Sequence, residues 1–190
     1  RIKLNCRALL LEAGDKRVLF ETGIGAFFEP KLQKRYGVEE SDHRLLANLA
    51  ALGVEPSDID LVVLSHLHFD HAGGLLPSYA EIEKGHTDLL FENAKYVVGK
   101  RAWERALNPH PRDRASFVTP IIEGLQNSGR LLIIDDAKPD TLMDGLISFS
   151  FTDGHTPGQM HSMIHGKKRK VFFAGDLVPG ASWVHVPVTM

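Results

Sequence analysis

The chain has 190 residues, of which 43% are hydrophobic and 24% are charged, as is usual for a globular domain with its own core. Its 22 Lys and Arg residues against 24 Asp and Glu residues give a net charge of -2, which excludes the strong basic field typical of nucleic-acid or anionic-membrane binding. No apolar run approaches the roughly 20 residues of a transmembrane helix, and a single cysteine, Cys6, excludes an internal disulfide framework and a cysteine-based zinc cluster.

The predicted elements begin with a hairpin of strands at 2–12 and 16–20, followed by a loop over 25–40 without a clean period. A helix is predicted from an N-cap at Ser41 to a stop at Gly53, because leucines recur on one face between them. Further strands are predicted at 61–64, 94–99, 131–134, 147–152, 162–165 and 170–174, and further helices at 100–108 and 117–127. Strands thus form an early and a late group with helices between them, which indicates two sheets with helices outside, a four-layer α/β sandwich.

Both ends of the sequence fall within apolar, strand-like stretches, and no signal peptide is visible. We therefore expect residues 1–190 to form a single domain that is incomplete at both ends and lacks a C-terminal part. The single cysteine fits a reducing compartment, so we expect a cytoplasmic location.

The segment from Ser65 to Gly74 reads SHLHFDHAGG and follows the apolar strand 61–64 directly. In an open α/β sheet, the carboxyl ends of strands face the crevice where ligands bind. Residues i and i+2 of an extended chain point the same way, roughly 6.6 Å apart. In this conformation His66, His68 and Asp70 would share one side, so that two imidazoles could bind one metal ion.

Two later fragments supply further ligand-type residues at strand ends. Gly154-His155-Thr156-Pro157-Gly158 places His155 on a turn whose backbone is restricted by proline and glycine. Asp176 follows the apolar strand 171–174. Histidines and aspartates after three separate strands favour a metal site assembled by the fold over isolated surface or core histidines.

In this order, H-x-H-x-D-H, G-H-T-P-G and a strand ending in G-D resemble the metallo-β-lactamase-fold hydrolase superfamily, and Glu21-Thr22-Gly23 resembles its early Asp-Thr-Gly turn. The resemblance covers nearly the whole chain and implies an αββα sandwich with a dinuclear site between the sheet edges. By position, the first metal would be held by His66, His68 and His155. The second would be held by Asp70 and His71, with Asp176 bridging both. The family pattern ends in a further histidine that this chain lacks; His185 is too early for it and is a candidate for the site wall.

Imidazole and carboxylate ligands without a thiolate suit zinc, and also manganese, cobalt or iron. A bridging water on such a pair has its pKa lowered toward about 7 and becomes a hydroxide nucleophile. Asp70, the candidate catalytic residue, can orient it and carry the proton to the leaving group. The expected reaction is hydrolysis of a small ester, lactone or thioester, with amides and phosphoesters as further possibilities and a small molecule rather than nucleic acid or membrane as partner.

Several branches of the superfamily match less well. The commonest zinc β-lactamases carry cysteine where Asp176 stands, diiron reductases carry Glu where His68 stands, and nuclease branches have an inserted domain. The segment 65–74 is most similar to acyl-homoserine lactonases, with glyoxalase-II-like, organophosphate-hydrolase-like and persulfide-dioxygenase-like members as competitors. Those lactonases place a catalytic tyrosine shortly after the bridging aspartate, whereas this chain continues Leu177-Val178-Pro179.

Two further functional classes are compatible with the sequence. One is a non-catalytic metal-binding or sensing member, which the missing final histidine would favour. The other is a mononuclear iron oxidoreductase. For the substrate pocket, apolar residues near the motifs are expected to form the wall: Phe27, Phe28, Phe69, Leu75, Leu76 and Trp183.

Overall fold

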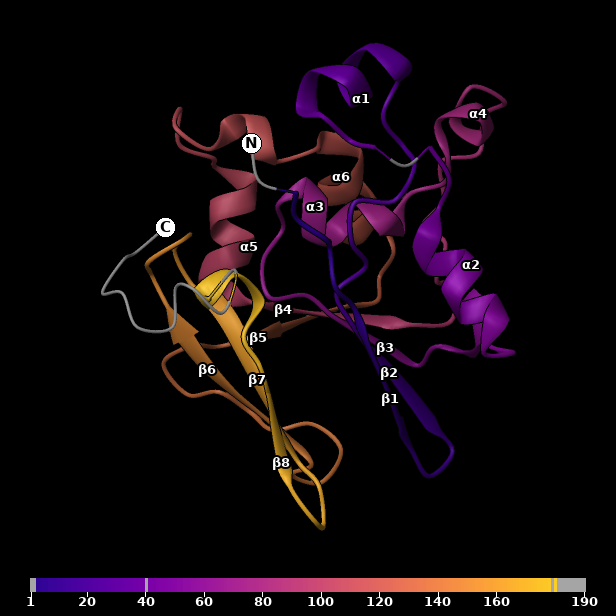
Figure 1. The fold of residues 1–190 in the computed structure, drawn as a ribbon. Coiled ribbons are helices and arrows are strands. Elements are labelled where there is room, and N and C mark those ends of the chain that lie inside the picture. Colours follow the sequence, from indigo (N-terminus) through magenta and orange to yellow (C-terminus); the bar gives the residue numbers. More distant parts are fainter. Residues whose placement is uncertain (1–2, 40, 179, 181–190) are drawn as a thin grey trace.

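The strands of the computed structural model form two sheets, and the structure describes residues 3–39, 41–178 and 180 (Figure 1). The first sheet has five strands in chain order: β1 (Leu9–Ala13), β2 (Lys16–Phe20), β3 (Leu61–Val63), β4 (Lys95–Gly99) and β5 (Leu131–Ile134). The second has three: β6 (Ile147–Thr152), β7 (Gln159–His165) and β8 (Lys170–Phe173). The predicted early and late groups of strands are therefore confirmed as separate sheets.

Strand direction brings several strand ends to one edge. β1 and β2 form the predicted antiparallel hairpin, and β2, β3, β4 and β5 then run parallel to their neighbours. The second sheet is antiparallel throughout. Because parallel strands end at the same edge, the residues that follow β2 and β3 lie beside each other.

The side chains of the first sheet divide between two cores by strand alternation. On β2, Leu19 faces the helices, while Val18 and Phe20 face the second sheet; all three are at most 1% exposed. The second core is completed by apolar residues of the late strands, among them Ile147 and Met160. Each such fully buried side chain contributes about 1.5–3 kcal/mol to stability, so the two sheets pack firmly and their ends are held in register.

The helices of the described part belong to the early and middle chain: α1 (Pro30–Tyr36), α2 (Arg44–Ala51), α3 (Phe69–Ala72), α4 (Tyr79–Ile82), α5 (Lys100–Leu107) and α6 (Thr119–Asn127). The expectation of an irregular loop over 25–40 was wrong, because α1 lies within it. Pro30 begins this helix and Gly37 ends it in the left-handed conformation, with φ 73°. None of its residues is buried, so no apolar period marks it in the sequence.

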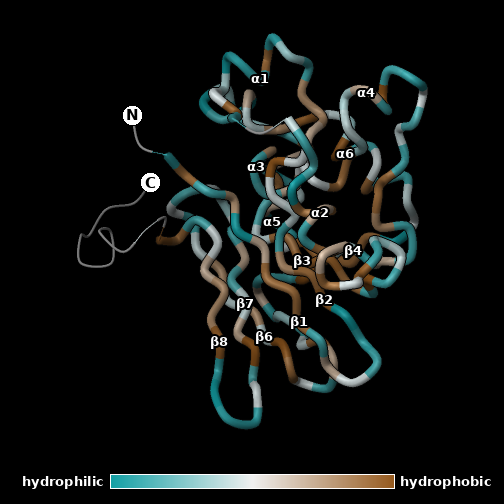
Figure 2. The backbone as a smooth tube through the Cα atoms, turned by 45° about the vertical axis from the view of Figure 1, so that its right-hand side comes forward, coloured by the Kyte–Doolittle hydropathy of each residue, from teal (hydrophilic) through white to brown (hydrophobic). Residues whose placement is uncertain are grey.

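The predicted α/β sandwich is confirmed, and the described residues form three of its four predicted layers; a helix layer over the outer face of the second sheet is not among them. Helices cover one face of the first sheet, and the second sheet packs on the other. Hydrophobic residues follow the strands of both sheets, while the β7–β8 turn and the outer parts of α1 and α4 are hydrophilic (Figure 2). Among the helices of the described residues, none combines the length and apolarity needed to cross a membrane.

Candidate metal centre

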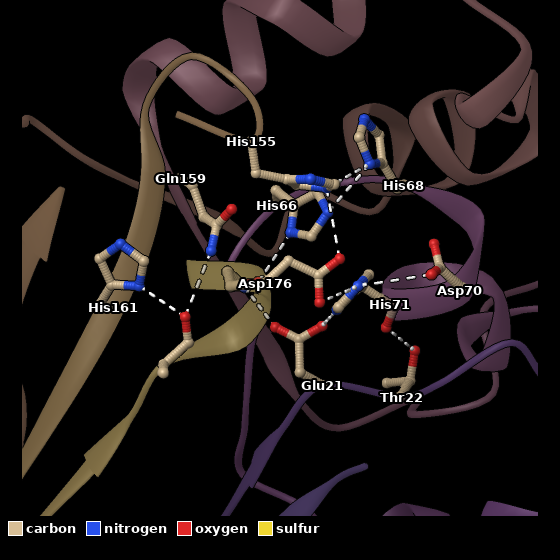
Figure 3. A network of polar contacts seen from close by, with 12 residues as sticks. Glu21, Thr22, His66, His68, Asp70, His71, His155, Gln159, His161 and Asp176 are labelled. Carbon is tan, nitrogen blue, oxygen red and sulfur yellow. Dashed lines mark hydrogen bonds and ion pairs between the residues drawn. The ribbon is translucent and has the colours of Figure 1, made fainter. Parts of the chain in front are cut away.

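Four strands deliver polar side chains to one place between the sheets (Figure 3). Glu21 follows β2, and His66 and His68 follow β3. From the second sheet, His155 follows β6 and Asp176 follows β8. The structure thus brings together side chains that lie up to 155 residues apart in the sequence.

The segment after β3 does not stay extended as predicted. His68 is extended, with φ -67° and ψ 151°, and caps the single helical turn α3, Phe69–Ala72. This turn rotates Asp70 away from the line of His66 and His68 and brings His71 to the interior, where its side chain is 13% exposed against 44% for Asp70. The prediction that alternate residues point the same way therefore holds for His66 and His68 and is wrong for Asp70.

Three imidazole nitrogens converge on one point. His68 Nδ1 lies 3.1 Å from His66 Nε2 and 3.1 Å from His155 Nε2. One ring nitrogen carries either one proton or one lone pair, so His68 Nδ1 cannot form an ordinary hydrogen bond to both. The Ser65 hydroxyl lies 2.9 Å from His66 Nδ1 and can accept its proton, which leaves the lone pair of His66 on Nε2. Convergent lone pairs of this kind fit a single metal ion.

A second group lies beside the first and shares His66 with it. Ligand atoms of His66, His71 and Asp176 all lie within 4.8 Å of one another, as do those of the first group. Asp176 stands between the groups, 3.3 Å from His71 Nε2 and 3.4 Å from His155 Nε2. Asp70 lies at the rim, 3.7 Å from His71 Nε2. The residues present can therefore hold ions at two neighbouring positions, with Asp176 between them.

Glu21, noted in the sequence only as part of the Glu21-Thr22-Gly23 turn, is a positioning residue for His71. It is 1% exposed and has a left-handed backbone, with φ 63°. Its carboxylate accepts the Ser65 N–H at 2.6 Å and lies 2.7 Å from His71 Nδ1. The Thr22 N–H and hydroxyl both donate to the His71 carbonyl, at 2.9 and 3.0 Å. The turn thus fixes His71 through ring and backbone and directs its Nε2 at Asp176.

The turn that carries Asp176 is anchored through the carbonyl of Ala174. That carbonyl accepts from Gln159 Nε2 at 3.3 Å and from His161 Nδ1 at 2.8 Å. Since a carbonyl only accepts, His161 carries its proton on Nδ1, and its Nε2 accepts the Thr152 hydroxyl at 2.8 Å. His161 therefore ties the end of β6 to the turn after β8.

Two glycines allow the close approach of these segments. A Cβ at Gly74 would lie 2.1 Å from the Thr22 carbonyl oxygen, so this position requires glycine. Gly175 has φ 53°, and a Cβ there would lie 2.7 Å from the Ser65 hydroxyl. Substitution at either position would separate strand ends that carry ligand-type residues.

Burial keeps the imidazoles of the first group neutral. It lowers the pKa of His68 to about 4, with the neighbouring His155 adding to the effect. Burial, then the charge of His71, lowers the pKa of His66 well below its usual range. Burial also lowers the pKa of His155. Neutral imidazoles are the form that binds metal, so the fold prepares this group for an ion.

The second group is electrostatically different. Burial alone would lower the pKa of His71, but Glu21 and Asp176 outweigh it and hold that pKa well above the usual value. Burial would raise the pKa of Asp176, but its contact with His71 holds that pKa below the usual value. Without a metal, this half of the site is thus a buried ion-pair network that an ion would replace.

The whole chain, residues 1–190, matches the sequence family described as the metallo-beta-lactamase superfamily. The chain belongs to this superfamily. Its α/β architecture and the H-x-H-x-D-H segment agree with that assignment, and the resemblance inferred from the motifs is confirmed.

Relatives within the metallo-beta-lactamase superfamily have several activities. N-acyl homoserine lactonase AttM of Azorhizobium caulinodans is 30% identical over 67% of this chain and 44% of its own length. Acyl-coenzyme A thioesterase MBLAC2 of Homo sapiens is 27% identical over 92% of this chain and 59% of its own. Ribonuclease TTHA0252 of Thermus thermophilus is 29% identical over 90% and 34%. The chain thus spans about half the length of the curated relatives it matches, and the names of these three relatives are those of hydrolases.

Solved structures share the superfamily fold. A probable metal-dependent hydrolase from Staphylococcus aureus superposes with a TM-score of 0.73 and 26% identity, over 86% of this chain and 55% of that one. AidC, described as a dizinc quorum-quenching lactonase, superposes with a TM-score of 0.66 and 24% identity, over 87% and 54%. The similarity to AidC concerns the fold alone.

The residues predicted to wall a pocket divide into three sets. Leu75, Leu76 and Phe27 are at most 8% exposed and belong to the core, so the expectation that they face a substrate was wrong. Phe28 and Phe69 are half-buried near the site. Trp183 and His185 lie outside the described residues.

The metal-free superfamily member should lose stability as the pH falls from about 6.5 to 4. His66, His68 and His155 have folded pKa values below the unfolded value, so the unfolded chain binds more protons in this window. His71, whose pKa is raised, changes stability only above about pH 6.5. Denaturant unfolding in the presence of a chelator should show a loss of about 2–3 kcal/mol between pH 7 and 4.5. The exposed-residue variant His86→Gln should show the same loss; a flat or rising stability would contradict the assignment of neutral imidazoles.

Replacing Glu21 by alanine should destabilise the metal-free protein by about 3 kcal/mol, because a buried charged partner of His71 is removed. The matched control is Glu39→Ala, since Glu39 pairs with Lys3 where both side chains are more than half exposed. That change should cost less than about 1 kcal/mol. Urea unfolding measures both, and equal effects would show that Glu21 does not hold His71.

Proposed function

We propose that this superfamily member is a hydrolase that uses two divalent metal ions, most simply zinc, to cleave a small ester, lactone or thioester. The observation that carries the proposal is the convergence of His66 Nε2, His68 Nδ1 and His155 Nε2, with 3.1 Å separations. Asp176, His71 and the rim carboxylate Asp70 would hold the second ion. The two groups of ligand-type residues contain imidazoles and a carboxylate and no cysteine. Such donors suit zinc, and manganese, cobalt or iron also accept them.

Bound there, such ions supply Lewis acidity for a carbonyl oxygen and lower the pKa of a water molecule. The protein's own residues provide the rest of the catalysis. Glu21 and the Ser65 hydroxyl fix the ring orientations of His71 and His66. Asp70, with a side chain 44% exposed beside His71, can take a proton from water and deliver it to the leaving group.

An aromatic cluster next to the site favours an apolar group on the substrate. The ring of Phe28 lies 5.1 Å from Phe69 and 5.2 Å from Tyr36, and the Phe117 ring lies 5.0 Å from His68. Tyr36 is 40% exposed, and the three phenylalanines are half-buried. A ligand that covers such rings gains about 0.8 kcal/mol for each methylene removed from water. The cluster therefore supports an acyl or aryl substituent.

The positions directly after Asp176 hold no tyrosine, since the chain continues with Leu177 and Val178. The leaving oxygen or sulfur must then be stabilised by the metals and by protonation from Asp70. This favours substrates with good leaving groups, so thioesters and aryl esters should react faster than unactivated lactones. The names of the relatives, a lactonase and an acyl-coenzyme A thioesterase, support a carboxylic acyl substrate.

A substrate panel tests the proposal on the full-length protein loaded with zinc. It comprises acyl-homoserine lactones, p-nitrophenyl esters, acyl thioesters, cephalosporins, aryl phosphotriesters and a single-stranded RNA. We expect turnover of the carboxylic esters and thioesters, with rates that rise with leaving-group acidity. Turnover of only the cephalosporins, phosphotriesters or RNA would overturn the acyl substrate class. Binding of metal without turnover of any member would support a sensing role, and oxygen consumption with a persulfide would support an iron oxidoreductase.

A further inference from the structure

Four buried side-chain atoms have no hydrogen-bond partner within the described part of the chain: His68 Nε2, Asp113 Oδ1, Thr156 Oγ1 and Gln159 Oε1. The first two have complementary chemistry. One is a ring nitrogen that can donate, and the other is a carboxylate oxygen that can only accept. Orphaned buried atoms are rare in folded proteins. A complementary pair next to one site calls for a common explanation.

Asp113 and His68 are neighbours through one short segment. Asp113 precedes the 3-10 turn Arg114–Ser116, and the next residue, Phe117, places its ring 5.0 Å from the His68 ring at 71°. The other carboxylate oxygen of Asp113 accepts Arg105 Nε from α5 at 2.8 Å. Burial lowers the pKa of His68, and Asp113 opposes this shift, so its charge acts on the ring.

Metal binding gives these atoms complementary roles. His68 directs Nδ1 at the other two imidazoles, so the lone pair that would bind an ion is on Nδ1. A neutral imidazole has one proton, which must then be on Nε2, the buried atom without a partner. Histidine ligands of metals almost always donate this second N–H to a carboxylate, a carbonyl or water.

We propose that Asp113 is the positioning residue of the first metal site and accepts the His68 Nε2–H in the metal-loaded protein, directly or across one water. Arg105 occupies one carboxylate oxygen of Asp113; the other oxygen would accept the proton of His68 and fix its ring, and the ring presents Nδ1 to the ion. The inference rests on the metal site of the proposed function and adds to it a residue from outside the ligand motifs.

The test compares variants of the full-length protein for their affinity for zinc, measured by competition with a chromophoric chelator. Asp113→Ala should weaken binding of the tighter ion about 10- to 100-fold. Asp113→Asn, which keeps an acceptor oxygen, should recover most of that loss. Arg105→Met removes the ion pair but keeps the carboxylate, so it should bind zinc within about threefold of the parent protein, as should the exposed control Asp140→Asn.

A second measurement applies even where a variant folds poorly. In the zinc-loaded parent protein, nitrogen–proton NMR should show the His68 Nε2–H as a slowly exchanging signal, and Asp113→Asn should shift it. Unchanged zinc affinity in Asp113→Ala, or an equal loss in Arg105→Met, would overturn the proposal, the latter because it would assign the effect to anchoring of the segment. Either result leaves the proposed function intact, whereas failure of the parent protein to bind zinc would remove both.

Discussion

Replacing His66 by alanine should abolish tight metal binding and lower hydrolytic activity by about three orders of magnitude or more, equal to at least ~4 kcal/mol of transition-state stabilisation. His66 has the largest expected effect because it belongs to both groups of ligand-type residues. It is also 1% exposed, so water cannot readily replace its nitrogen. The measurements are metal content after dialysis and kcat/KM on the best ester of the panel.

The matched control is His86→Ala, in which an exposed imidazole outside both groups is removed. It should keep the metal content and activity of the parent protein. Circular dichroism of the metal-free His66→Ala variant separates loss of ligand from loss of fold. A folded His66→Ala variant that retains two ions and parental activity would contradict the assignment of the site.

The second large effect is expected for Asp70→Asn, which should lower kcat about 10²- to 10⁴-fold while the fold is kept. The amide has the same shape but cannot accept a proton, and it removes one anionic ligand from the rim. Because the side chain is 44% exposed and contacts His71 only at 3.7 Å, stability should change by less than about 1 kcal/mol.

An exposed carboxylate away from the site, Asp15→Asn, is the control for charge alone. It should leave kcat unchanged. A parental rate for Asp70→Asn would show that proton transfer uses another group, and the metal site itself would stand. Loss of metal from Asp70→Asn equal to that of His66→Ala would assign Asp70 a purely structural part in the centre.

The sequence predicted the strands and the residues that meet at their ends, because alternation and apolar runs mark buried strands strongly. It did not predict α1, since a helix with no buried residue leaves no apolar period. It also placed Asp70 on an extended line, whereas a helical turn begins at Phe69. A helix of four residues covers little more than one turn of about 3.6 residues, so its apolar residues show no repeat that would distinguish it from an extended segment.

The residues that orient the ligands were harder still to predict. Glu21 acts on His71 from 50 positions away, and the link depends on β2 and β3 lying side by side. Asp113 falls in a charged loop whose sequence indicates only a surface segment. His43, which stands in a polar stretch of the sequence, caps α2 and lies 3.0 Å from the Gly74 carbonyl oxygen. Such contacts between distant segments are set by the tertiary fold and have no local signal.

The most direct test of the account is the number of divalent ions bound by the purified full-length protein, measured by elemental analysis after growth in zinc-supplemented medium and removal of loosely bound metal. We predict about two ions per chain, as in two-metal hydrolytic sites, falling below one in His66→Ala. Absence of bound transition metal from a folded parent protein would contradict the central claim that these side chains form a metal centre.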